Sequence, residues 1–403
     1  MKDLVVQGWM TEYANLPTLY RDRVDLHLLS GEDLSVSLQR CGEELLRRYL
    51  SNGDVAAIRD VIKVPDEYQN WKRVVGLYPL TAQAFLQGVS AYQSDTRAVF
   101  ETPLGALPVD GRLVRYVPPS APVEEIEDLG TMLEGARQNP LQIPFPSASD
   151  ASRLFMTYAP VLEVDELSKA DRIGMPFWNR ENEPDVDVAK PAVFVRTAHT
   201  RFSGETLLQI VYSFWFPERP RASLFDLLGG TLDGITWRVT LDRNGKPILF
   251  DSMHNCGCYH VFFPTNELRL RARSSTLEEP VLIGAKLGSL QAAERVVLRI
   301  ASGTHYIQYV RFEGGLEVEG DRRYAFVPDD RLRSLQVGVD SHRSLFQPDG
   351  IVSGTQRGER YFFWPMGIRD PGAMRQWGRH ATAFVGRRHF DDPDIVERYF
   401  EYP

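Results

Sequence analysis

The sequence has little cysteine, no excess of basic residues and no long apolar run. Only three of its 403 residues are cysteine, and this odd count excludes a scaffold in which every cysteine is paired in a disulfide. The formal net charge of −8 argues against general binding to nucleic acid or to anionic membranes, because both need basic surface. No apolar run approaches the roughly 18 to 20 residues that span a bilayer. We therefore expect neither a nucleic-acid partner nor a transmembrane segment.

The composition is otherwise that of a folded, soluble chain. Hydrophobic residues make up 43% and charged residues 25% of the sequence, and a chain of this length usually forms two or three domains. The N-terminus, MKDLVVQGWMTEY, lacks the apolar stretch of an intact signal peptide. The cytoplasm is the default compartment, although a mature exported chain given a new initiator Met would look the same.

Residues 1–102 are predicted to be mainly helical. Apolar residues recur at helical spacing from Leu34 to Tyr49, and Asn52-Gly53 supplies a stop. Cys41 lies on this stripe and is predicted to be a small buried residue. Further helices are expected over 54–62 and 81–100. Residues 103–150 contain eight prolines and are expected to form an irregular connector.

Beyond residue 150 the apolar period changes to two, which indicates strands. Asn244-Gly245 between two apolar runs is a strong hairpin signal. The sequence predicts an α+β fold: a helical N-terminal region, then a larger antiparallel β-rich domain over 151–330, built as a sandwich or an open barrel. Residues 331–403 are expected to be a mixed extension packed on it, with a short helix within 393–402. The predicted strands span 192–199, 207–216, 235–241, 248–250, 258–263, 281–286, 295–301 and 304–312.

The stretch His254-Asn255-Cys256-Gly257-Cys258-Tyr259-His260 is the main chemical signal. It gathers two of the three cysteines and two of the eight histidines. In a regular strand Cys256 and Cys258 would lie about 6.6 to 7 Å apart along one face, whereas two thiolates on one zinc ion approach to about 4 Å. Only a bend at Gly257, which tolerates positive φ, would let the two sulfurs meet.

The leading hypothesis is a zinc-binding protein, acting as a hydrolase or lyase on a small polar or anionic substrate. Cys256, Cys258, His260 and His254 would be the ligands, with His199 as a distant fourth partner from a strand end. An open position on the metal would lower the pKa of a bound water towards 7. Glu205 or Asp251 would then serve as general base.

Three other hypotheses stay open. The cysteines could form a Cys-x-Cys redox dithiol, whose disulfide ring would be strained and therefore easily reduced. One cysteine could be a nucleophile with a neighbouring histidine as base. Without any chemistry, the chain would be a binding or scaffold protein with a protein partner, and the cysteines and histidines would be ordinary buried residues.

A late tract rich in tryptophan and arginine runs from Trp364 to His380. Its arginines Arg375 and Arg379 are candidates for binding a carboxylate or another anion of the substrate, because guanidinium groups bind such anions through two hydrogen bonds. The plainer interpretation is a loop held against the core by its tryptophans.

Overall fold

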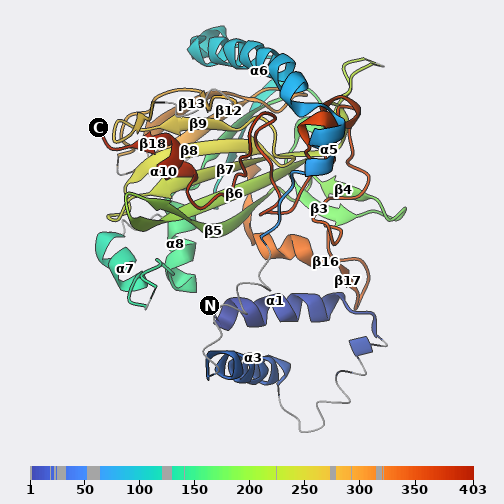
Figure 1. The fold of residues 1–403 in the computed structure, drawn as a ribbon, viewed down its shortest axis with the longest axis vertical. Helices are drawn as coiled ribbons and strands as arrows, with labels where there is room; N and C mark the ends of the chain where they lie inside the picture. The colour runs from blue at the N-terminus through green and yellow to red at the C-terminus, as the bar shows by residue number, and fades with distance from the viewer. Residues whose placement is uncertain are drawn as a thin grey trace.

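The computed structural model describes residues 2–18, 20–21, 24, 33–51, 64–119, 129–139, 141–223, 225–272, 278–291, 293–314, 320 and 322–403. Across these residues the chain forms an α+β fold with mixed sheets (Figure 1). The predicted fold class is therefore confirmed. The helix expected over 54–62 lies outside the described residues.

The larger sheet has seven strands in the order β11-β9-β8-β7-β6-β5-β15. The five strands from β5 to β9 pair antiparallel, as their alternation predicts, whereas both edge strands run parallel to their neighbours. The predicted hairpin is present, and Gly245 has the positive φ of 85° that its turn requires. The strands are β5 (Ala192–Phe202), β6 (Glu205–Arg219), β7 (Gly230–Leu241), β8 (Pro247–His254), β9 (Val261–Pro264), β11 (Leu282–Ile283) and β15 (Ala325–Pro328).

A second sheet has five strands in the order β13-β12-β2-β1-β14. Its strand β1 falls in the proline-rich segment where we expected irregular chain. Val114 and Tyr116 of β1 are fully buried, but a strand this short gives little alternation to detect among prolines. The strands are β1 (Arg112–Val117), β2 (Val161–Glu166), β12 (Glu294–Ile300), β13 (Ile307–Gly314) and β14 (Arg322–Arg323).

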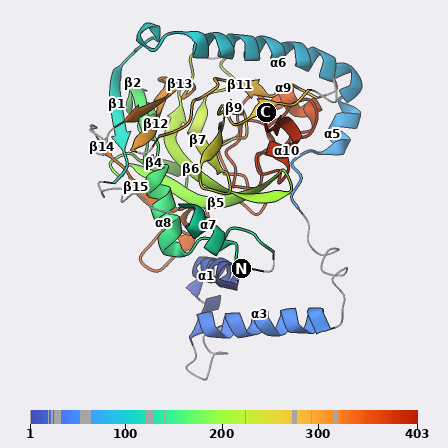
Figure 2. The same ribbon diagram turned by 90° about the vertical axis from the view of Figure 1, so that its left-hand side faces the viewer.

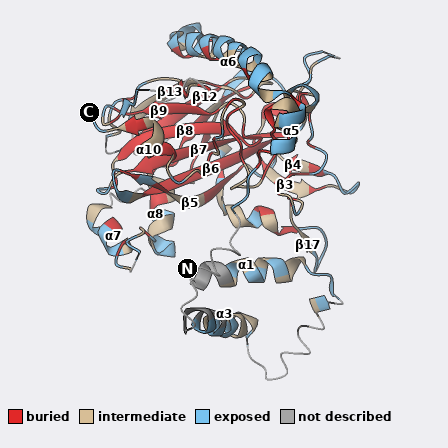
Figure 3. Cartoon of the chain, in the orientation of Figure 1, coloured by how far each residue is buried: buried red, intermediate tan, exposed pale blue. Residues whose placement is uncertain are grey.

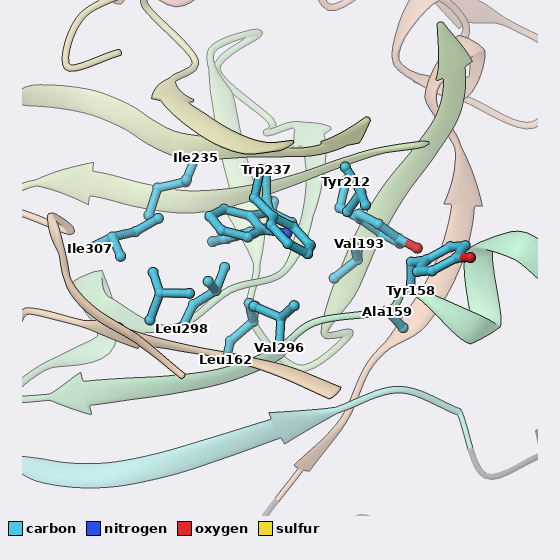
Figure 4. Packing of buried hydrophobic residues seen from close by; sticks show 14 of the residues in the cluster. Tyr158, Ala159, Leu162, Val193, Tyr212, Ile235, Trp237, Val296, Leu298 and Ile307 are labelled. Carbon is cyan, nitrogen blue, oxygen red and sulfur yellow. The ribbon is translucent and has the colours of Figure 1, made fainter. Parts of the chain in front are cut away.

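The two sheets pack face to face around the main core, so the β-rich part is a sandwich. Leu162, Val296 and Leu298 from the smaller sheet point towards Tyr212 and Trp237 of the larger one (Figure 4). All of these side chains are buried, and burying one large apolar side chain contributes roughly 1.5 to 3 kcal/mol. The alternation seen in the sequence is thus the inward face of each strand.

Most helices lie around the sandwich, whereas α1 and α3 lie beyond α7 and α8 (Figure 2). The predicted helices over 34–49 and 81–100 are present as α3 and α6, and α6 lies along the rim of the sandwich. The prediction for Cys41 was wrong: it is exposed, because α3 packs against α1 rather than into the core. The helices are α1 (Lys2–Asn15), α3 (Leu34–Ser51), α5 (Asn70–Val75), α6 (Tyr78–Glu101), α7 (Leu129–Ala136), α8 (Ala148–Thr157), α9 (Arg360–Phe363) and α10 (Ile395–Tyr399).

The C-terminal segment packs on the larger sheet through short elements and long loops. The helix predicted within 393–402 is present as α10, which contacts β5. Burial is deepest in the central strands, whereas α5 and much of α6 are exposed (Figure 3). The remaining elements are β3 (Met175–Trp178), β4 (Pro184–Asp187), β10 (Arg269–Leu270), β16 (Leu335–Gln336), β17 (His342–Arg343), β18 (Phe400–Glu401), η1 (Leu104–Ala106), η2 (Lys169–Asp171), η3 (Asp329–Arg333) and η4 (Trp364–Met366). Among the described helices, none is long and apolar enough to cross a membrane.

Candidate functional site

The Cys-Gly-Cys segment forms a tight loop between β8 and β9. Gly257 has φ of +94°, a conformation that favours glycine. The loop is closed by two backbone hydrogen bonds: the Gly257 amide donates to the His254 carbonyl at 2.7 Å, and the His254 amide donates to the Cys258 carbonyl at 2.9 Å. The bend that the sequence required at Gly257 is therefore present.

Two buried side chains hold this loop against the rest of the molecule. The Asn255 side chain accepts a hydrogen bond from Thr236 at 2.7 Å and donates to the Phe214 carbonyl at 3.4 Å. On the other side, Arg375 donates from its backbone to the Asn255 carbonyl at 2.9 Å and from Nε to the Cys256 carbonyl at 3.1 Å. The loop is thus fixed both to the sheet and to the C-terminal segment.

The bend places the two cysteines at the wall of one cavity. The interaction between the two thiols lowers the pKa of Cys256, and it raises that of Cys258 well above its ordinary value. The Cys258 amide also lies 3.4 Å from the Cys256 sulfur, and Arg357 further lowers the Cys256 pKa. Of the two thiols, Cys256 is therefore the one that loses its proton more readily. Both cysteines are free thiols in this structure.

Both thiols line a cavity of about 520 Å³ between the loop, α6 and the C-terminal segment. Much of its wall is apolar, and it includes Phe85 and Val89 of α6, Phe363 of α9 and the loop residue Phe384. At one side the Arg388 guanidinium bonds Glu279 at 3.0 Å, so these two charges neutralise each other. A cavity of this size and lining suits a small, largely apolar molecule.

Glu359 is a titratable group of this cavity that the sequence analysis did not single out. The residue is 4% exposed and lines the cavity with the two cysteines. Burial raises its pKa to about 7, so it exchanges a proton near neutral pH. When ionised, its charge raises the pKa of both thiols.

His254 is directed towards a buried network of charges. Its Nδ1 lies 3.5 Å from Asp233 Oδ1, and the same carboxylate receives Arg357 at 3.2 Å and His305 Nδ1 at 2.8 Å. Burial lowers the pKa of His254 despite the neighbouring carboxylate. The ring packs edge-on against Tyr259, with the two centroids 4.9 Å apart.

His260 and Asp251 form a second buried cluster. His260 Nε2 lies 2.8 Å from Asp251 Oδ2, and Arg238 bonds the same carboxylate through Nε at 2.9 Å and through a terminal nitrogen at 2.5 Å. Burial lowers the pKa of His260 to about 4. Arg238 holds the Asp251 pKa below its ordinary value, so Asp251 is an ionised partner of Arg238.

The two remaining candidates for metal ligand and base lie elsewhere. His199 on β5 has its Nε2 2.8 Å from the Pro144 carbonyl and packs against Phe145, with the two ring centroids 5.1 Å apart. Glu205 at the start of β6 is exposed and pairs with Arg243 at 3.0 Å. Neither residue lines the cavity of the two cysteines.

Arg375 and Arg379 both bind Glu67, which is fully buried. Each guanidinium donates to one oxygen of this carboxylate at 3.1 Å. Arg375 is itself 2% exposed, and it also donates hydrogen bonds to the backbone carbonyls of Cys256 and Asp370. Its guanidinium group is thus bound to other groups of the protein. Glu67 lies in the segment before α5, far from both arginines in sequence. No local sequence pattern predicts that these residues pair.

The structure thus brings together Cys256 and Cys258 of the predicted metal ligands, with His254 and His260 beside them but bound to carboxylates. Within the described part of the chain, no group of three or more Cys, His, Asp or Glu side chains has the arrangement of a metal site. Comparison of the sequence with models of protein families and with curated proteins, and of the structure with solved structures, finds no match.

Proposed function

We propose that the protein is a thiol–disulfide oxidoreductase whose redox centre is the Cys256–Cys258 pair, acting on a small, largely apolar disulfide. The observation that carries this proposal is geometric: both cysteines line one apolar cavity, and the bend at Gly257 places the Cys258 amide 3.4 Å from the Cys256 sulfur. Such a pair supplies an attacking thiolate and a second thiol close enough to complete the exchange.

The reaction balances with the residues present. The Cys256 thiolate attacks one sulfur of the substrate disulfide, the bond between the substrate sulfurs breaks, and the leaving thiolate takes a proton from Glu359. The Cys258 thiol then gives its proton to the Glu359 carboxylate and attacks the Cys256 sulfur, which releases the second half of the substrate as a thiolate. Two electrons pass from the cysteines to the substrate, and a Cys256–Cys258 disulfide remains.

The cavity supports a neutral substrate over a charged one. Its Glu279 and Arg388 charges are paired with each other, and the remaining carboxyl group, Glu359, repels anions once it is ionised. Taking an unpaired charge from water into such a wall is costly. The substrate half that leaves first is expected to lie towards Glu359.

The test uses a Cys41→Ser variant, because Cys41 is exposed and would react on its own. The reduced protein is mixed with neutral dithiodipyridine or with the dianionic dithiobis(nitrobenzoate), and released thiol is followed by absorbance. We expect two equivalents of released thiol per protein, an intact mass lower by two hydrogens, and a faster reaction with the neutral reagent.

The matched control adds Cys258→Ser to the same variant. It should release one equivalent and keep a mixed disulfide on Cys256, because no second thiol completes the exchange. The proposal fails if the protein with both cysteines also stops at a mixed disulfide, or if neither thiol reacts while the protein is folded.

A zinc-type centre is a second candidate, supported by the bend at Gly257 and by the position of both cysteines at one cavity. Cys256 and Cys258 would hold the ion, and the cavity beside them has room for substrate or water. The ion would supply Lewis-acid chemistry. Metal analysis of the purified protein and of its Cys256→Ser/Cys258→Ser variant tests it: stoichiometric metal in the first and none in the second would favour this candidate.

A further inference from the structure

Large apolar side chains are exposed on α5, on the start of α6 and on α9. Six of them, which we call the apolar rim, are between 61% and 74% exposed. A cluster of this kind on a soluble protein marks an interaction surface far more often than isolated exposed residues do. The apolar rim consists of Trp71, Val74, Val75, Leu80, Tyr361 and Phe362.

These elements pack together on one side of the molecule (Figure 2). Trp71, Val74 and Val75 are three and four residues apart, so they share one face of α5. α5 is tied to the C-terminal segment by the hydrogen bond from the Gln69 amide to the Gly367 carbonyl at 2.7 Å. α6 and α9 meet through the rings of Phe85 and Phe363, whose centroids are 5.7 Å apart.

The apolar rim is continuous with the cavity of the two cysteines. Leu80, Ala84 and Gly88 are spaced by four residues and therefore lie along one stripe of α6. Ala84 and Gly88 line the cavity, and Leu80 continues their stripe towards α5. On α9, Phe363 lines the cavity directly after Phe362 of the rim.

The charges among the apolar rim are mostly positive, although the whole chain carries −8. Lys72 has its ammonium group 5.8 Å from the centre of the Trp71 ring, and Arg360 is next to Tyr361. Asp370 is an acidic group near both cations, and its negative charge favours their protonated forms. The acidic neighbours on the other side are neutralised: Asp66 pairs with Arg387, and Glu67 is buried between arginines.

We propose that the apolar rim docks on the surface of an anionic lipid bilayer, with the cavity opening towards the lipid. Exposed Trp and Tyr beside Lys and Arg are typical of residues at the boundary between headgroups and acyl chains. Apolar burial supplies the affinity, and Lys72 and Arg360 supply the preference for anionic headgroups. Docking in this orientation would let an apolar substrate pass from the bilayer to the thiols.

The experiment is co-sedimentation of the full chain with phosphatidylcholine vesicles, with and without phosphatidylserine. The rim variant Val74→Ser/Leu80→Ser should lower the partition coefficient by about tenfold or more, because two apolar side chains no longer enter the lipid. The matched control is Val109→Ser/Val339→Ser, whose valines are 49% and 89% exposed outside the rim. It should bind like the wild-type protein.

The preference for anionic lipid is tested by a second variant, Lys72→Gln/Arg360→Gln. It should lose the increase in binding that phosphatidylserine gives to the wild-type protein.

Because the substituted valines and Leu80 are all exposed, we expect the variants to unfold at the same temperature as the wild-type protein. This measurement checks that the fold is intact. The proposal is overturned if the wild-type protein stays in the supernatant with both kinds of vesicle, or if the rim and control variants sediment alike. It is also overturned if the wild-type protein is a dimer in solution that the rim variant dissociates, because the rim would then cover a second copy of the chain. The assay does not use the thiols, so its outcome is separate from that of the redox test.

Discussion

At the scale of single residues, the site depends on two opposite shifts in proton affinity. Burial raises the pKa of the Glu359 carboxyl group to about 7, while the hydrogen bond from Cys258 lowers the pKa of the Cys256 thiol. The two groups therefore differ in role although they line one cavity: the Cys256 thiol ionises more readily than an ordinary thiol, and Glu359 exchanges a proton near neutral pH.

Replacing Glu359 with Gln should increase thiol reactivity above neutral pH. Ionised Glu359 raises the pKa of both thiols, and Gln removes that charge, so more Cys256 is thiolate at a given pH. Alkylation by iodoacetamide in a Cys41→Ser background should be several-fold faster at about pH 8 and little changed at about pH 6, where Glu359 is already protonated. A Glu294→Gln control at the start of β12, outside the cavity, should behave like the parent. A Glu359 variant that reacts at the rate of the parent at both pH values would contradict this role.

His305 should stabilise the fold more at low pH than at high pH. It lies buried between Asp233, 2.8 Å from its Nδ1, and Asp171, 3.5 Å from its Nε2, and these carboxylates raise its pKa. A raised pKa contributes stability that is complete below the ordinary value of about 6.5 and is lost as pH rises through the folded-state value. His305→Gln should therefore cost about 1 to 3 kcal/mol at about pH 6 and less at about pH 9. Denaturant unfolding across this range measures it, and a cost independent of pH would show that the imidazole is neutral.

At the scale of elements, the site is made by one loop. The sequence predicted strands on both sides of it, because short apolar runs beside turn residues are a local signal. It also identified Gly257 as the residue that must bend the chain, from the distance between alternate side chains in a strand. Glu359, Glu67 and α9 could not be predicted in this way, since they reach the loop only through tertiary packing. Likewise, the sequence suggested His254 and His260 as metal ligands because it does not show which side chains they contact. In the structure their partners are the carboxylates of Asp233 and Asp251.

Gly257→Ala should destabilise the protein and disrupt the thiol pair. A Cβ at this position would lie 2.6 Å from the Ala381 carbonyl oxygen, and φ is +94°, so we expect a loss of about 2 to 4 kcal/mol in the free energy of unfolding. Gly204→Ala is the matched control, because Gly204 has a φ of +80° but no atom within 4 Å of the added Cβ. It should cost about 1 kcal/mol, the backbone strain alone. Equal losses in the two variants would mean that the Ala381 contact is relieved at no cost.

At the scale of the whole molecule, the sandwich provides a rigid wall and the later segments complete the cavity. The thiol loop is anchored to β7 and the adjacent β6 through Asn255, whereas the opposite wall comes from α6 and from the C-terminal segment. Parts of the chain far apart in sequence therefore meet at one site. Composition and periodicity predict the layers of such a molecule, but not which loops meet across them.

Gly88→Trp should restrict access to the thiols without harming the fold. Gly88 lines the cavity, and a Cβ there meets no atom within 4 Å. The indole is expected to fill part of the opening and to slow the reaction with dithiodipyridine by roughly tenfold, equivalent to about 1.4 kcal/mol in the barrier. Ala98→Trp, on the exposed face of the same helix and away from the cavity, should react at the wild-type rate. Equal rates for both variants would mean that the thiols are reached by another route.

The most direct measurement of the central claim is the intact mass of the Cys41→Ser protein equilibrated in glutathione buffers of graded redox ratio and quenched in acid. A redox pair predicts two species alone, the dithiol and a form lighter by two hydrogens whose peptide map joins Cys256 to Cys258, exchanging in one two-electron transition. Stable glutathione adducts in place of the internal disulfide, or a dithiol that persists in the most oxidising buffer, would contradict the assignment of Cys256 and Cys258 as a redox centre.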